Sequence, residues 1–84
     1  MHQKEEILEG IFFILQMNVP AGNKQIDRNT YFKDLKLSAI TFAKFIRELE
    51  LHFKIEIPSS IINYFKNIDQ LSSYILTQLN KSYE

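Results

Sequence analysis

The sequence has no cysteine and only two glycines and two prolines among its 84 residues. Without thiols, the chain can form no disulfide framework, no thiolate metal site and no cysteine nucleophile. Its stability must therefore come from packing, for which seven phenylalanines and four tyrosines supply large side chains. This length allows a single small core, so we expect one domain over residues 1–84.

An excess of charge of either sign is also absent. Ten lysines and arginines balance ten aspartates and glutamates, which gives a formal net charge of zero. A duplex-binding domain of this size would normally carry a basic excess or stripe, so we predict no nucleic-acid partner.

Long apolar runs are missing as well. The longest run covers residues 11–15, far fewer than the roughly twenty residues of a membrane span. Acidic residues precede it, rather than the basic segment that opens a secretory signal. We therefore expect a cytoplasmic protein without a membrane span.

Apolar residues recur at three- and four-residue spacing in three segments, and this spacing predicts three main helices. The first covers residues 3–17, the second about 39–53, and the third about 68–79. The second helix should bury the face formed by Phe42, Phe45, Ile46, Leu49 and Phe53. The third should bury Ile68, Leu71, Ile75 and Leu79.

The segments between these helices complete the expected fold. Pro58 precedes a shorter helix. Residues 24–36 form a long polar connection, which we expect Tyr31, Phe32 and Leu35 to anchor to the core. The sequence thus predicts an all-α bundle of three main helices and one short helix, with a long loop between the first two main helices.

Two single residues carry local predictions. Gly10 lies inside the first helix, where glycine costs about 1 kcal/mol relative to alanine, so we expect another segment to approach it closely. Ser38 lies immediately before the second helix, where its hydroxyl can cap exposed backbone N–H groups.

Residues for catalysis are scarce. His2 is near the N-terminus, and His52 is predicted to be a surface residue near a helix C-terminus. Glu48 and Glu50 are two residues apart and do not share a helix face, and two isolated glycines cannot form a phosphate-binding loop. We therefore predict no catalytic residues, no metal site and no enzymatic activity.

Residues 32–58 carry a series of short motifs in an ungapped order. These are Asp34-Leu35, Leu49-Glu50, the aromatic Phe53 and the pair Ile57-Pro58. Their order and the plan of helices resemble the acyl and peptidyl carrier proteins of fatty-acid, polyketide and nonribosomal peptide synthesis. The resemblance implies a freestanding, monomeric carrier that holds an acyl or aminoacyl thioester on a 4'-phosphopantetheine arm.

The sequence departs from this family at the residue that would carry the arm. Counted from Asp34 or back from Leu49, the modified serine of the family falls on Ala39, which has no hydroxyl. The resemblance therefore implies that the arm is absent from this chain as written. Three explanations are open: Ala39 is an engineered substitution of serine that keeps the protein unmodified, the protein has lost the arm and become an interaction module, or Ser38 is the acceptor.

Lys36 marks a second departure. It occupies the place of the family's usual glycine, so we expect the loop backbone to differ there.

The resemblance also implies partners: a phosphopantetheinyl transferase and acyl- or aminoacyl-transferring or synthase enzymes. Family members that serve freestanding fatty-acid synthases tend to be acidic along the second helix, whereas this helix has basic residues on its outward side. The residues that we expect to meet partners are Lys36, Ile40, Ala43, Lys44, Arg47 and Leu51. In an alternative interpretation, Lys44 and Arg47 form a solvated face with Glu48, which is four residues after Lys44.

Overall fold

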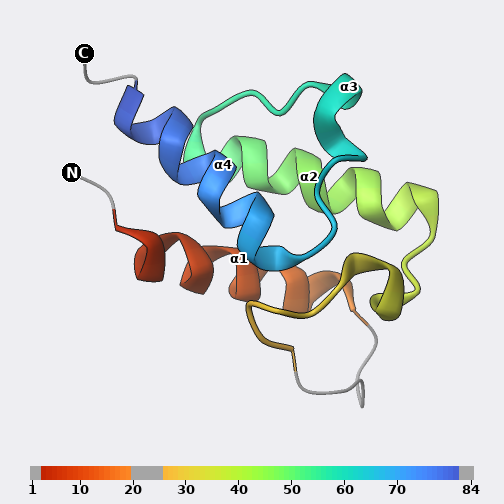
Figure 1. The fold of residues 1–84 in the computed structure, drawn as a ribbon. Helices are drawn as coiled ribbons and strands as arrows, with labels where there is room; N and C mark the ends of the chain where they lie inside the picture. The colour runs from red at the N-terminus through yellow and green to blue at the C-terminus, as the bar shows by residue number, and fades with distance from the viewer. Residues whose placement is uncertain (1–2, 20–25, 82–84) are drawn as a thin grey trace.

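The computed structural model describes residues 3–19 and 26–81, and these residues form the predicted all-α bundle (Figure 1). The main helices are α1 (Lys4–Asn18), α2 (Ala39–Phe53) and α4 (Ile68–Lys81). The short helix α3 (Ser59–Ile62) follows Pro58, and a 3-10 helix, η1 (Phe32–Leu35), precedes α2. The sequence predicted the four α-helices and missed η1.

Helix α1 organises the bundle, because it packs against both α4 and α2. Its buried residues Ile7, Ile11 and Leu15 meet the buried faces of the other two main helices in one core. The predicted face of α4 is buried in full. On α2, Phe45, Ile46 and Leu49 are buried, whereas Phe42 and Phe53 are partly buried at the edges of the core.

The close approach predicted at Gly10 is confirmed. A Cβ atom on this residue would lie 2.7 Å from Cζ of Phe53 and 3.3 Å from Nε2 of His52. Gly10 therefore lets the last turn of α2 pack directly on the backbone of α1. This contact explains why α1 tolerates a residue of low helix propensity at its centre.

Residues 28–32 are tied to the chain at the start of α4 by backbone hydrogen bonds. The amide of Phe32 donates to Lys66 O at 2.9 Å, that of Ile68 to Thr30 O at 3.2 Å, and that of Asp69 to Arg28 O at 2.8 Å. This pairing gives the end of the long connection a fixed position beside α4 (Figure 1).

Two of the three predicted anchors of this connection are confirmed. Phe32 and Leu35 are buried in the core. The prediction for the Tyr31 side chain is wrong: it is 44% exposed, and Tyr31 is held instead by backbone pairing with Asn67. The aromatic side chain next to it, Phe32, fills the core position, where it packs edge-on to Phe42 at 5.5 Å between ring centroids.

The break predicted after the first helix lies partly outside the described residues, since α1 ends at Asn18 and the description resumes at residue 26. His2 lies outside them too. Among residues 3–19 and 26–81, no helix combines the length and apolarity needed to cross a membrane.

Candidate functional site

The N-terminus of α2 is exposed, and Ser38 caps it. The Oγ of Ser38 accepts the N–H of Thr41 at 3.1 Å and donates to Thr41 Oγ1 at 2.9 Å. The predicted cap is therefore confirmed. Ala39 is the first helical residue, and its methyl group is at the surface. The next residue, Ile40, is 83% exposed.

The loop before this terminus ends in an unusual backbone conformation at Lys36. Its φ of 53° and ψ of 42° lie in the left-handed region, which favours glycine. The expected departure from a glycine-type backbone is therefore not seen: the lysine adopts that conformation and bears its cost. The turn directs the chain from η1 into Ser38, so it helps to position the start of α2.

The outward side of α2 carries a row of four residues, which we call the α2 row: Ile40, Lys44, Arg47 and Leu51. All four are exposed, Leu51 to 65%. At 3.6 residues per turn these positions fall within a sector of about 60° on the helix, so they share one face. Ala43 is exposed beside the row and Lys36 just before the helix. Five of the six predicted partner residues thus lie on one side of α2, and the sixth, Lys36, is exposed in the loop before it.

The two carboxylates of α2 bind other segments of the chain, a feature that the sequence did not predict. Glu48 Oε1 accepts a hydrogen bond from Asn18 Nδ2 at 3.0 Å, which ties α2 to the end of α1. Glu50 Oε2 accepts the N–H of Ile57 at 2.8 Å. Lys44 and Arg47 are exposed, and no ion pair joins Lys44 to Glu48 among the described residues, so the alternative of a solvated face formed by Lys44 and Arg47 with Glu48 stays an expectation.

Glu50 also shapes a groove at the far end of the α2 row. Its carboxylate holds the backbone of Ile57, and its carbonyl accepts the N–H of Ile55 at 3.2 Å, so the chain after α2 turns back along the helix. The resulting open groove is lined by Arg47, Leu51, Lys54, Ile55, Glu56 and Pro58. A groove lined by both apolar and charged side chains, Glu50 among them, therefore lies next to the exposed side chain of Leu51.

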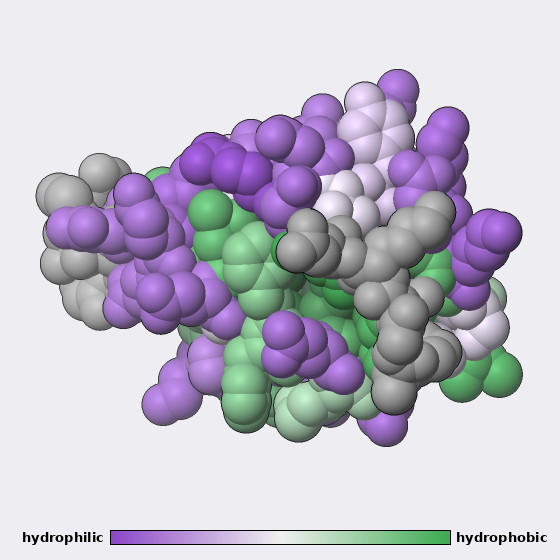
Figure 2. All heavy atoms as spheres, turned by 90° about the horizontal axis from the view of Figure 1, so that it is seen from below, coloured by the Kyte–Doolittle hydropathy of each residue, from purple (hydrophilic) through white to green (hydrophobic). Residues whose placement is uncertain are grey.

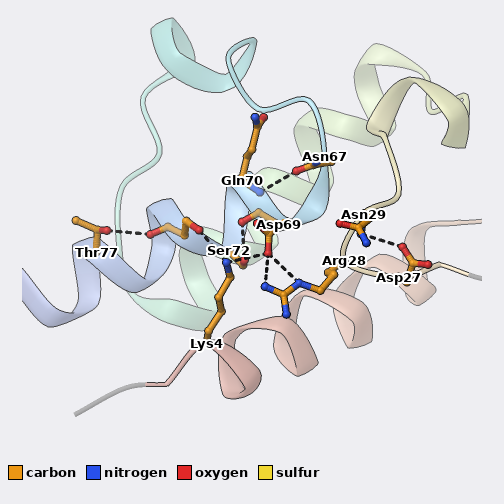
Figure 3. Close-up of polar contacts among 10 residues, drawn as sticks. Lys4, Asp27, Arg28, Asn29, Asn67, Asp69, Gln70, Ser72 and Thr77 are labelled. Carbon is orange, nitrogen blue, oxygen red and sulfur yellow. Dashed lines mark hydrogen bonds and ion pairs between the residues drawn. The ribbon is translucent and has the colours of Figure 1, made fainter.

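A separate ion cluster lies on the other side of the molecule and fixes the connection to α1 and α4 (Figure 3). Asp69 lies 2.8 Å from Lys4 Nζ and 2.7 Å from Arg28 Nη2. Hydrogen bonds from Lys4 and then Arg28 lower the pKa of the Asp69 carboxyl below its usual value. Asn67 and Gln70 add local bonds at the same helix start: Asn67 Oδ1 accepts the Gln70 N–H at 2.9 Å, and Gln70 Oε1 that of Lys66 at 2.7 Å.

One histidine, His52, lies on α2. His52 is exposed near the end of the helix, as predicted, and its ring stacks edge-on with Phe53 at 4.7 Å. Within the described ranges, no three histidine or acidic side chains lie together as a metal ion would require.

Apolar side chains also reach the surface elsewhere. Phe13 and Met17, one turn apart on α1, are 62% and 59% exposed. Figure 2, which views the molecule from below, shows hydrophobic residues (green) among hydrophilic ones (purple) on this face.

Comparison with known proteins adds one finding. A family model described as "Phosphopantetheine attachment site" matches residues 15–75. This match covers most of the chain, from the end of α1 to the middle of α4. The search of curated proteins gave no match.

Proposed function

The chain belongs to the phosphopantetheine-attachment family of carrier proteins, and from this premise we propose that it acts as an acyl or peptidyl carrier. In this role it would present an acyl or aminoacyl thioester to enzymes of fatty-acid, polyketide or nonribosomal peptide biosynthesis. The family match over residues 15–75 is the observation that carries the proposal.

The attachment position of this carrier is residue 39. The register of the motifs leads to this assignment, and the exposed start of α2 supports it because a partner enzyme can reach that point. The residues present do not fit the prosthetic group, however. Attachment of a 4'-phosphopantetheine arm needs a side-chain oxygen that can form a phosphodiester, and Ala39 has only a methyl group. We therefore propose that this chain is held in the unmodified form.

Ser38 is the alternative acceptor, one residue before Ala39. Its hydroxyl already caps α2 through Thr41, and modification there would remove a cap worth about 1 kcal/mol. This engagement supports a structural role for Ser38.

Intact mass after incubation with coenzyme A and a promiscuous phosphopantetheinyl transferase tests the assignment. The unaltered chain should gain no mass, whereas Ala39→Ser should gain one arm. Adding Ser38→Ala to Ala39→Ser should leave loading possible, because residue 39 is then the acceptor. An arm on the unaltered chain would instead make Ser38 the acceptor.

The docking surface proposed for the partner enzymes is the α2 row with Lys36 and Ala43. Its exposure supports this role, and Ile40 would provide the central apolar contact of a small, transient interface. In the Ala39→Ser protein, Ile40→Asp should abolish loading while the helical circular-dichroism signal is unchanged, since the side chain is 83% exposed. Met17→Asp is the matched control, because Met17 is also exposed but lies on α1. Loading of Ile40→Asp at the parent rate would remove Ile40 from the interface.

A second candidate function follows from Ala39 itself: a carrier-fold interaction module that has lost the prosthetic group. Such a module would use the same surface and would need no acceptor. If Ala39→Ser stays unloaded by the transferase although it is folded, this second function is favoured over the first.

A further inference from the structure

The electrostatic character of the α2 row identifies the kind of partner that it fits. We infer that this row docks a protein partner with an acidic docking face, in which carboxylates lie between two apolar sites. The inference rests on the proposed function, because it assigns a chemistry to the partner of that same surface.

The first step concerns charge on the row. Although the chain has no net charge, Lys44 and Arg47 form the centre of the row and are exposed. In the described part of the chain, the ion pairs join Lys4 and Arg28 to Asp69. Neither Lys44 nor Arg47 has an ion-pair partner there. A cationic pair without an ion-pair partner among the described residues is available to attract an anionic surface.

The second step concerns the carboxylates of α2, which balance its two cations in number. Glu48 and Glu50 are the carboxylates of α2, and both are committed to other segments, Glu48 to Asn18 and Glu50 to the Ile57 amide. The exposed carboxylates of Asp34 and Glu56 belong to the segments before and after the helix. The exposed charges along the α2 row itself are therefore the cations Lys44 and Arg47, whereas Glu50 and Glu56 line the groove at the far end of the row.

The third step concerns the apolar residues at the two ends of the row. Ile40 and Leu51 are eleven positions apart, which corresponds to about 16 Å along the helix axis. Both side chains are mostly exposed, and Leu51 borders the open groove that Pro58 also lines. A matching partner therefore needs two apolar sites at about this separation, one of them able to enter the groove.

A protein fits this pattern better than an anionic lipid surface does. A helix that lies in a bilayer interface presents a continuous apolar face, whereas here cations separate two isolated apolar side chains. Specific protein interfaces combine apolar anchors with charges that steer the encounter.

Binding of a designed probe to the unaltered, isotope-labelled chain tests the inference. The probe is a helix-forming peptide of roughly 20 residues, with leucines about 16 Å apart and glutamates on the same face between them. A second peptide has glutamines in place of these glutamates. We expect the glutamate peptide to shift the amide resonances of the α2 row and to bind about tenfold more tightly than the glutamine peptide at low salt. Raising sodium chloride from about 50 to about 500 mM should remove most of this difference.

Two double variants with the same net charge distinguish binding at the α2 row from nonspecific electrostatic attraction. Lys44→Gln with Arg47→Gln should lose the preference for the glutamate peptide. Lys66→Gln with Lys81→Gln removes two exposed cations outside α2. This variant should keep the preference for the glutamate peptide. Equal binding of the two peptides by the unaltered chain would overturn the inference. An equal loss of the preference for the glutamate peptide in both double variants would also overturn it. Binding to phosphatidylglycerol vesicles without binding to the glutamate peptide would also overturn it and would assign the row to a lipid surface.

These results are independent of the arm. If Ala39→Ser is loaded but the chain shows no acidic preference, the inference fails and the carrier function stands. If the preference is present but no variant is loaded, the carrier function fails and an interaction module with an acidic partner is left.

Discussion

Replacing Lys36 with glycine should stabilise the protein, although it removes a side chain from the loop that leads into α2. The backbone of Lys36 has a φ of 53°, a conformation that costs residues other than glycine roughly 1–2 kcal/mol. Glycine avoids this cost but loses about 0.5–1 kcal/mol more conformational entropy on folding. The expected net gain in the free energy of unfolding is therefore about 0.5–1 kcal/mol.

Thermal unfolding followed by circular dichroism can resolve this gain. For a domain of this size, 1 kcal/mol shifts the melting temperature by roughly 4–8 °C, so Lys36→Gly should melt about 2–8 °C higher than the parent. The same change at Lys54 should also be stabilising, because this residue ends α2 with a φ of 58°.

Lys44→Gly is the matched control. It removes the same side chain and charge from an exposed position, but within α2. There glycine has no strain to relieve and should lower the stability by about 0.5–1 kcal/mol. If Lys36→Gly and Lys44→Gly lowered the melting temperature equally, left-handed strain at Lys36 would be refuted.

Three further changes probe the core and the ion cluster. Phe45→Ala should cost roughly 3–5 kcal/mol in chemical denaturation, because Phe45 is fully buried, whereas Leu51→Ala at the surface should cost little. Gly10→Ala should destabilise the protein despite better helix propensity, since the new Cβ would lie 2.7 Å from Phe53 Cζ, and Phe53→Leu should relieve part of that cost in a double-mutant cycle. Asp69→Asn should be less stable than the parent at neutral pH. Because the folded pKa of Asp69 is lowered, this difference should shrink in denaturation curves as the pH falls below about 4.

The helices were predictable because their signals are local. For α2, the spacing of apolar residues and the hydroxyl of Ser38 both lie within the segment, and the helix begins and ends where they indicate. The same periodicity placed Ile40 and Leu51 on the outward side. Gly10 also indicated a close approach by another segment, because glycine has a low helix propensity. It did not identify Phe53 as the neighbour.

The features that the sequence did not reveal depend on distant partners or on unfavourable local choices. Lys36 adopts a glycine-type conformation without being glycine, so no turn signal marks it. The carboxylates of Glu48 and Glu50 are directed by Asn18 and Ile57, which belong to other segments. Tyr31 and Phe32 are equally plausible core residues in the sequence, and only the backbone pairing beside α4 decides between them.

The backbone pairing of residues 28–32 with the start of α4 has a consequence for the order of folding. Helix α2 can form from contacts within its own segment, whereas the Phe32 amide finds its acceptor, Lys66 O, only after the chain has closed a long loop. Contacts between residues distant in sequence form late and slow the folding of small domains. In pulsed hydrogen exchange during refolding, the amides in the middle of α2 should therefore become protected before that of Phe32. The loop that leads into Ser38 would then be among the last parts of the molecule to assemble, and it would depend on a helix at the opposite end of the chain.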